Sequence, residues 1–469
     1  MVLLFAVVMS SLVGKVLPWP MPRPLVQIGV GAAIGMVAEL RVPLDPHVFF
    51  LLFLPPLLFL DGWRIPREEV MRDRGPILEL ALGLVVFTVF GLGFLIHWMI
   101  PAIPQTVAFA LAAVLAPTDP LAVAAVARRV PIPPRMMHIL EGEALLNDAS
   151  ALVCFRFAVA AVLTGSFVLA DAAIEFVWVA GVGIAVGVGI AVLVSGLRGF
   201  LGRRFADDSG TLILISLLMP YGAYLIAETF GASGILAAAA AGLTMNFVDP
   251  IPSSMASVRL RGGLVWDMIA FTANGVIFVL LGEQLPVILR RADAIVGLSG
   301  HVSHWWLAVH VLAVVGGLLA LRFAWVWVSL HISLFRTKAQ ISHASRLRIV
   351  AAMSMAGVRG AVTLAAILGL PLFLPDGSDF PARDLVIFLA MGTILVSVIA
   401  ATMILPWLLR GLEGLEENPD EAAEEAAQIA AAEAAIKAIA RVEAQAARGN
   451  ADAGQIVEVA ARVMAPYRR

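Results

Sequence analysis

Thirteen apolar segments, each close to the length of a membrane-spanning helix, recur through the first 410 residues of the chain. A helix needs about 20 apolar residues to cross the hydrocarbon core of a bilayer. The chain is 61% hydrophobic and 14% charged, whereas a soluble domain averages about 45–50% and about 25%. The pattern predicts an all-α polytopic membrane protein with helices near 1–17, 24–39, 47–63, 76–100, 104–127, 138–163, 172–196, 210–230, 232–247, 264–285, 304–332, 348–370 and 384–410.

The basic residues between these segments indicate how the chain is oriented in a plasma membrane. Cytoplasmic loops carry an excess of Lys and Arg. If the N-terminus lies outside, the inside loops hold eighteen Lys and Arg residues, and the outside loops hold only Arg41, Arg290, Arg291 and Arg383. A wrong number of upstream helices would put this alternation out of phase. We therefore predict thirteen spans, N-out and C-in; because three segments are short, twelve is the alternative.

Several classes of site are excluded by composition. The chain has one cysteine, Cys154, which excludes an intrachain disulfide and C-x-x-C motifs. Its eight histidines show no H-E-x-x-H spacing. We therefore expect no cofactor, and no nucleic-acid partner. Residues 1–16 lack a basic leader region and a cleavage site, so they are predicted to be a retained first helix rather than a signal peptide.

Past Arg410 the composition changes to a stretch rich in Ala, Glu and Arg. These are good helix formers, and Asp420 can cap a helix N-terminus. We predict that residues 411–469 form a cytoplasmic helical tail. A solvated charged tail is the alternative, because the heptads contain few large apolar residues.

Acidic residues interrupt two of the apolar segments between positions 116 and 156. They are Asp119, Glu141, Glu143 and Asp148. A charged side chain at the centre of a bilayer costs about 2.5–3.5 kcal/mol on insertion scales. We therefore expect these carboxylates to line a polar cavity enclosed by protein.

The fifth apolar segment contains the sequence Ala-Pro-Thr-Asp-Pro at residues 116–120. Two prolines three residues apart remove backbone donors and clash with preceding carbonyls, so the helix should break here. Broken helices at the bilayer midplane expose free N–H and C=O groups, which secondary transporters use to bind ions. We predict that Thr118 and Asp119 lie at such a break; a simple proline kink is the alternative.

Asn147 and Asp148 lie midway along the sixth segment. Glu143 and Asn147 are four residues apart and share a helix face, with Asp148 turned by about 100°. Dehydration favours the protonated form of a carboxyl group, so a proton and a cation can compete for Asp148. Such competition gives an exchanger that carries Na⁺ or H⁺ but not both. The alternative is a carboxylate buried to pair with a basic group, which is the favoured interpretation for Glu143.

Arg359 interrupts the twelfth segment between Gly357 and Gly360. These glycines permit a local break or a close backbone approach. A lone arginine at this depth must find a carboxylate. Glu143 is the predicted partner, which leaves Asp148 available to an ion.

Further polar residues have open roles. Asp61 ends the third helix beside Arg64, and it faces either the cavity or the membrane interface. Asn274 and Glu283 lie on the tenth helix and either line a cation path or help helices to pack, which is the commoner explanation. Arg156 is predicted to have a structural role.

At these residues the sequence resembles the monovalent cation/proton antiporters, in the branch of the bacterial and animal sodium/proton exchangers. The matching stretches are LPPLLFLDGWRIP, APTDPLAVAAVARRV, LEGEALLNDASALVCFRFA and GVRGAVTLAAIL, with weaker likeness in GASGILAAAAAGL and GVIFVLLG. They occur in the family's order and cover nearly all of residues 1–410.

The resemblance implies two inverted repeats and two crossed broken helices, one at the Thr-Asp-Pro segment and one around Arg359. It implies an antiporter domain over residues 1–410 that forms a homodimer in the lipid bilayer. Within it, core helices would lie at about 76–163 and 304–410, and dimerisation helices at about 1–63 and 210–285.

The resemblance also assigns roles to residues. It implies that Asp148 binds Na⁺ or H⁺, that Asn147 orients it, and that Thr118 and Asp119 lie nearby. It matches Glu143 and Arg359 to the family's structural ion pair. An Asn-Asp pair goes with electroneutral one-for-one exchange in this family. Asp61 is a further candidate for binding the cation or proton, although it is offset from the position of the acid in many animal members.

One departure affects the choice of cation. The family usually has Ser where this chain has Ala144, so one oxygen ligand is missing and the choice between Na⁺ and K⁺ is open. We expect Na⁺ or Li⁺ exchange for H⁺, with K⁺/H⁺ exchange as the alternative. A cation channel would use symmetric rings of acids or carbonyls. An intramembrane hydrolase would need a nucleophile–base pair or a metal site, so the chain is predicted not to be an enzyme.

Overall fold

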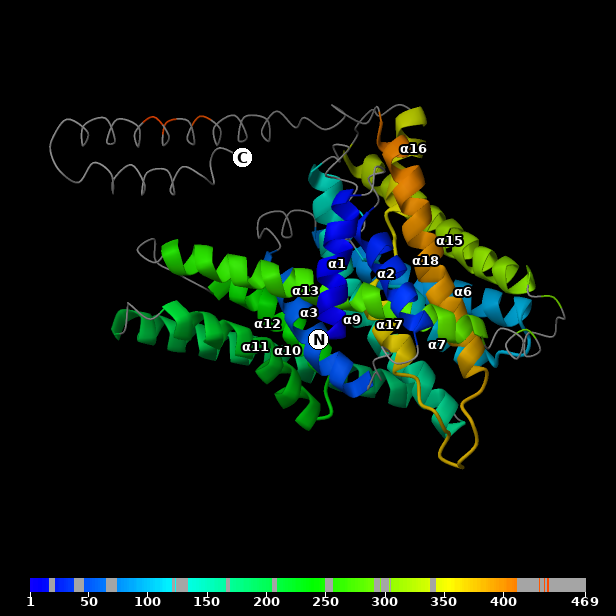
Figure 1. Cartoon of the computed structure of the whole chain (residues 1–469), viewed down its shortest axis with the longest axis horizontal. Coiled ribbons are helices and arrows are strands. Elements are labelled where there is room, and N and C mark those ends of the chain that lie inside the picture. Colours follow the sequence, from blue (N-terminus) through cyan, green and yellow to red (C-terminus); the bar gives the residue numbers. More distant parts are fainter. Residues whose placement is uncertain are drawn as a thin grey trace. The chain divides into compact units, whose positions relative to one another are not determined.

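Figure 1 shows the computed structural model of the chain. It describes residues 1–16, 22–37, 46–64, 74–119, 134–165, 169–204, 209–248, 256–290, 305–337 and 343–410, with single positions at 123, 296, 303, 430, 434 and 437. The chain divides into two compact units, Met1–Gly411 and Leu412–Arg469. Apart from three single positions, the predicted helical tail lies outside the described residues, so it stays a prediction.

Helices follow the predicted apolar segments in the first unit. Seven of the described helices are long and apolar enough to cross a membrane, and three shorter ones are also apolar. The all-helical class is confirmed for the described residues, whereas the count of thirteen spans and the orientation stay predictions. The helices are α1 (Val2–Val16), α2 (Arg23–Met36), α3 (Pro46–Arg64), α5 (Arg74–Leu78) with the π-helix η2 (Glu79–Leu84) and α6 (Val85–Met99), α7 (Gln105–Leu115), α9 (Pro134–Thr164), α10 (Leu169–Arg204), α11 (Ser209–Thr229), α12 (Gly234–Val248), α13 (Ala256–Arg290), α15 (Trp305–Thr337), α16 (His343–Met355), α17 (Ala361–Leu368) and α18 (Arg383–Leu409).

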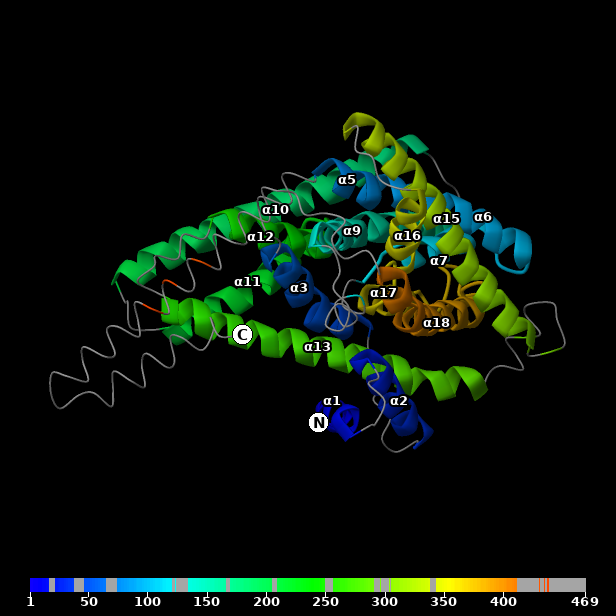
Figure 2. The same cartoon turned by 90° about the horizontal axis from the view of Figure 1, so that it is seen from above.

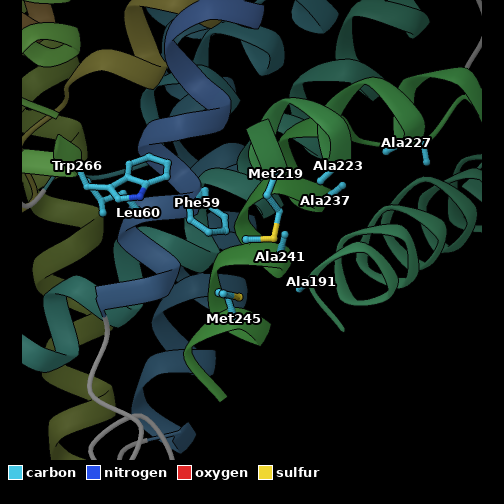
Figure 3. Close-up of a cluster of buried hydrophobic side chains, with 11 residues drawn as sticks. Phe59, Leu60, Ala191, Met219, Ala223, Ala227, Ala237, Ala241, Met245 and Trp266 are labelled. Carbon is cyan, nitrogen blue, oxygen red and sulfur yellow. The ribbon is translucent and has the colours of Figure 1, made fainter. Parts of the chain in front are cut away.

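Helices α10, α11 and α12 pack on one another, and α3 packs on α11 and α12. These four helices, α3 included, are called the α10–α12 group below. Small residues permit this packing, because helix association in lipid relies on close van der Waals contact. A Cβ added to Gly242 of α12 would lie 2.0 Å from the carbonyl oxygen of Phe59 on α3. Figure 3 shows the buried cluster that joins this group to α13: Phe59, Leu60, Ala191, Met219, Ala223, Ala227, Ala237, Ala241, Met245 and Trp266.

Helix α9, which carries Glu143, Asn147 and Asp148, packs mainly against other neighbours. Its main contacts are with α7 and with the α5–η2 segment, and α6 in turn packs on α7 and α15. At its other side α9 touches α10 and α12, beside which it lies in Figures 1 and 2. Helix α9 therefore lies at the border between the α10–α12 group and the helices around α7.

Two of the predicted apolar segments contain described residues that are not helical, and these residues meet. Helix α7 ends at Leu115, and residues 117–119 are not helical. Residues 356–360 separate α16 from α17, so the predicted break at Arg359 is confirmed. The Asp119 N–H donates a hydrogen bond to the Val358 carbonyl at 2.7 Å. This bond joins the two interruptions at a crossing point; the inverted repeats stay a prediction.

Candidate ion-binding site

The carbonyl groups at the end of α7 accept hydrogen bonds from two side chains near the second break. These are Arg359, between α16 and α17, and Thr363, in the first turn of α17. Arg359 Nε donates to the Leu115 carbonyl at 2.8 Å, and Thr363 Oγ1 donates to the Val114 carbonyl at 3.0 Å. Arg359 also donates to the Gly357 carbonyl through Nη1. The last carbonyls of a helix have no partner within the helix and carry partial negative charge, so a cation stabilises them. Arg359, which is 3% exposed, therefore caps α7.

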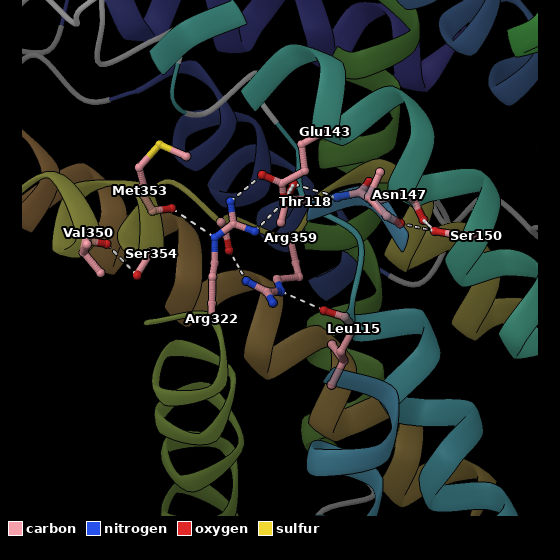
Figure 4. Close-up of polar contacts among 12 residues, drawn as sticks. Leu115, Thr118, Glu143, Asn147, Ser150, Arg322, Val350, Met353, Ser354 and Arg359 are labelled. Atoms are coloured by element: carbon pink, nitrogen blue, oxygen red, sulfur yellow. Dashed lines mark hydrogen bonds and ion pairs between the residues drawn. The ribbon is translucent and has the colours of Figure 1, made fainter. Parts of the chain in front are cut away.

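Glu143 pairs with Arg322 of α15, and not with Arg359 as the sequence predicted (Figure 4). Arg322 Nη2 donates to Glu143 Oε2 at 2.7 Å, and Nη1 donates to Oε1. Arg322 Nε donates to the Met353 carbonyl at 3.0 Å. A buried ion pair is stable only where its geometry is good and its other donors are satisfied, and this pair meets both conditions. The predicted Glu143–Arg359 pair is wrong because Arg359 donates instead to the carbonyls of Leu115 and Gly357.

Thr118 and Asn147 extend this pair into a hydrogen-bonded network (Figure 4). Thr118 Oγ1 donates to Glu143 Oε1 at 3.2 Å, and Asn147 Nδ2 donates to Thr118 Oγ1 at 2.9 Å. Asn147 is 1% exposed. Its Oδ1 atom has no hydrogen-bond partner among the described residues. The network thus orients the Asn147 amide and leaves its oxygen as a buried acceptor.

A cavity of about 220 Å³ adjoins the crossing point. Its apolar wall includes Leu54, Leu57 and Leu58 of α3. Asp148 is buried at this cavity. The polar residues that line the cavity are Asp61, Arg64, Thr118, Asp119, Glu141, Asp148, Asn274 and Thr363.

Four of the five predicted binding residues line this one cavity: Asp61, Thr118, Asp119 and Asp148. Asn147 is buried beside it in the network described above. Asp61 is solvent-exposed in the structure and lines the cavity, and its role in binding the cation or proton stays a prediction.

The remaining polar residues separate into two sets. Glu141 and Asn274 line the cavity. Glu283 is buried in α13 on the side that packs against α2, where the backbone at Gly35 approaches the backbone at Glu283. Arg156 forms an ion pair with Glu228.

Arg322 is the site residue that the sequence analysis missed. It is an arginine within the apolar segment 304–332, and the argument applied to Arg359, that a charge at bilayer depth needs a partner, applies to it equally. Arg322 and Glu143 are 179 residues apart in sequence. Spacing along the chain therefore could not show which of the two arginines reaches Glu143.

The part of the chain that contains these helices matches a known family. A family model described as "Sodium/hydrogen exchanger, transmembrane" matches residues 2–411. The chain belongs to the sodium/hydrogen exchanger family. The resemblance found in the sequence is thereby confirmed, and this is a family of transporters rather than of enzymes. Like its bacterial relatives, this exchanger is a multi-pass protein of the plasma membrane.

Relatives of this exchanger include well-matched bacterial proteins and one solved archaeal fold. "Uncharacterized Na(+)/H(+) exchanger YjcE" of Escherichia coli K12 is 41% identical over 476 residues, which cover 100% of this chain and 87% of that protein. "Sodium, potassium, lithium and rubidium/H(+) antiporter" of Bacillus pumilus is 42% identical over 410 residues, which cover 87% of this chain and 60% of that protein. The sodium proton antiporter MjNhaP1 of Methanocaldococcus jannaschii matches with a TM-score of 0.67 and 20% identity, over 88% of this chain and 98% of that one. At this identity, the last likeness shows the fold alone.

Proposed function

We propose that this exchanger family member moves Na⁺ or Li⁺ in exchange for H⁺, one for one, with Asp148 binding either ion. The position of Asp148 carries the proposal: its carboxylate lies at a cavity beside the crossing point and accepts no hydrogen bond from a described residue. Oxygen atoms are the ligands that hard cations prefer. Thr118, Asp119 and Asp61 supply further oxygens in the same cavity.

Exchange follows from the chemistry of one carboxylate. A proton and a cation cannot occupy the same carboxylate together, so each transit carries one or the other. The Na⁺-loaded and H⁺-loaded forms carry the same charge, because either ion neutralises Asp148. Asn147 adds no second titrating group, so the complete cycle would move no net charge across the membrane.

The buried charges near Asp148 would hold the helices around it together as a rigid support. The Glu143–Arg322 pair and the Arg359 cap join α7, α9 and α15 to the segment between α16 and α17. We propose that this core, at about 76–163 and 304–410, moves against helices at about 1–63 and 210–285, which would also form the homodimer. The N-out, C-in orientation belongs to the same proposal.

Cation-driven proton flux in proteoliposomes containing a trapped pH dye tests this proposal. Na⁺, Li⁺ and K⁺ would be added in turn, with and without a voltage clamp by K⁺ and valinomycin. We expect Na⁺ to drive a proton flux that is insensitive to voltage and absent from Asp148→Asn, while the folded amount of that variant is unchanged. Exchange at the wild-type rate by Asp148→Asn would overturn the assignment, and voltage-driven flux without a counter-proton would favour a channel.

K⁺/H⁺ exchange is the second candidate. It is supported by the name of the Bacillus pumilus relative, which includes potassium. Ala144 supports it as well, because it lines the cavity and offers no side-chain oxygen. Proton flux driven by K⁺ and not by Na⁺ in the same assay would favour this candidate while keeping Asp148 as the site.

A further inference from the structure

An ion pair joins α9 to the hairpin of α11 and α12, eight residues beyond Asp148. Arg156 Nη2 donates to Glu228 Oε1 at 2.9 Å. The same oxygen accepts a hydrogen bond from the backbone N–H of Gly234 at 3.2 Å. Glu228 lies in the last turn of α11, and Gly234 begins α12. One carboxylate oxygen therefore connects three helices.

Arg156 lies on the face of α9 that also lines the cavity. Residues three or four apart share a helix face, and the series Glu141, Leu145, Asp148, Leu152 and Arg156 follows this spacing. At about 1.5 Å per residue, Arg156 lies about 12 Å along the axis from Asp148. Leu152, between them, is buried. The cavity and the ion pair therefore lie on opposite sides of a buried apolar residue.

The ion pair also crosses a border between helix groups. Helices α11 and α12 pack within the α10–α12 group, whereas α9 packs mainly on α7 and the α5–η2 segment. Any movement of α9 against the α10–α12 group would change the distance between Arg156 and Glu228. The side chains are 43% and 37% exposed, so water can solvate both charges when they separate.

We propose that Arg156 and Glu228 are positioning residues that hold this end of α9 to the α11–α12 hairpin in the described conformation. In this conformation, called cavity-open below, the cavity at Asp148 is present. The pair would separate when the cavity closes. This inference rests on the proposed function, since it assumes that α9 alternates between two positions. Exposed ion pairs change an equilibrium constant by about 1.5- to 5-fold, so the pair biases the exchanger toward the cavity-open state and does not lock it.

Reversible cross-linking tests whether the two residues must separate. In a Cys154→Ser background, Arg156→Cys with Glu228→Cys would be joined by a short bis-methanethiosulfonate reagent. We expect Na⁺-driven proton flux to stop on cross-linking and to return with a reducing agent. The matched control is Trp178→Cys with Phe230→Cys, which joins α10 to the turn after α11, where Trp178 Nε1 donates to the Phe230 carbonyl at 3.4 Å. Both control positions lie on the α10–α12 side, so this cross-linked protein should keep its flux.

Charge reversal provides a second, independent measurement. Arg156→Glu and Glu228→Arg should each raise the apparent KM for the cation on the cavity side by up to about fivefold, because apparent affinity scales with the population of the binding-competent state. The double variant should return toward the wild-type KM. Flux that persists in the cross-linked Arg156/Glu228 protein, or a double variant no better than the single variants, would overturn the inference. Failure of the proposed function would instead appear as wild-type flux that does not need Asp148.

Discussion

Arg322 and Arg359 are both buried near the crossing point, yet different groups satisfy their charges. Arg322 pairs with the Glu143 carboxylate, and Arg359 donates to carbonyls at Leu115 and Gly357. A charge at bilayer depth requires a partner, and either a carboxylate or backbone carbonyl groups can serve as that partner.

A double-mutant cycle should distinguish the two arginines. Removing Arg322 leaves Glu143 as an uncompensated buried charge, which costs about 3–5 kcal/mol. Arg322→Met should therefore lower the melting temperature strongly, and Glu143→Met together with Arg322→Met should recover much of the loss. Arg359→Met should combine with Glu143→Met nearly additively. Thermal unfolding in detergent measures these differences, and strong coupling of Glu143 to Arg359 alone would contradict the pairing.

Ala144 offers a test of cation choice at a single position. It lines the cavity one helical turn before Asp148. Ala144→Ser would add a hydroxyl oxygen there, and one such polar contact is worth about 0.5–1.5 kcal/mol. We expect the ratio of the apparent KM for K⁺ to that for Na⁺ to rise about two- to tenfold in proteoliposomes. Ala151→Ser on the same helix, buried away from the cavity lining, is the control and should leave the ratio unchanged. The same ratio in Ala144→Ser and wild type would show that position 144 does not meet the cation.

At the scale of elements, the crossing point depends on a glycine. A Cβ added to Gly360 would lie 1.7 Å from Asp119 Oδ2, so any side chain would displace this carboxylate. We expect Gly360→Ala to reduce Na⁺-driven flux at least tenfold, with folded protein still obtained. Gly189→Ala in α10 is the matched control, because a Cβ there meets nothing within 4 Å, and its flux should equal that of wild type. Normal flux in Gly360→Ala would mean that the position of Asp119 is not important.

Element boundaries show what hydropathy can and cannot predict. The last apolar segment, predicted at 384–410, is α18 at Arg383–Leu409, because the bilayer length and the flanking charges fix a span closely. The segment predicted at 76–100 contains the π-helix Glu79–Leu84, which apolar composition does not distinguish from an α-helix. Ser150 Oγ donates to the Ala81 carbonyl of this π-helix at 2.6 Å, a tertiary contact that no local pattern predicts.

For the whole molecule, competition at one carboxylate predicts how transport responds to pH. Lower pH raises the protonated fraction of Asp148, so the apparent KM for Na⁺ should rise as pH falls on the side of cation binding. The rise should approach tenfold per pH unit where the protonated form dominates, and saturating Na⁺ should restore the maximal rate. Initial rates over a grid of Na⁺ concentration and pH measure this. A KM independent of pH would contradict competition.

The candidate site was predictable from sequence as a set of residues but not as a set of partners. Carboxylates in apolar segments are costly wherever the segments lie, so Asp119 and Asp148 are recognisable in the sequence alone. The partner of Glu143 depends on which helices pack together, and α15 reaches it from far along the chain. The division of Asp61 and Glu283 between cavity and helix interface depends on the same packing.

The hydrogen bond from the Asp119 N–H to the Val358 carbonyl excludes proline from position 119 of the first break. Pro117 and Pro120 have no N–H group to donate, and of the two residues between them Asp119 donates to the second break. Moving either proline onto position 119 would keep the local composition while removing the N–H group that donates to the Val358 carbonyl. The order of the four residues Pro-Thr-Asp-Pro therefore matters for a contact with a distant segment, and not only for local backbone geometry. A version with the same four residues in an order that puts proline at position 119 should not form the crossing point.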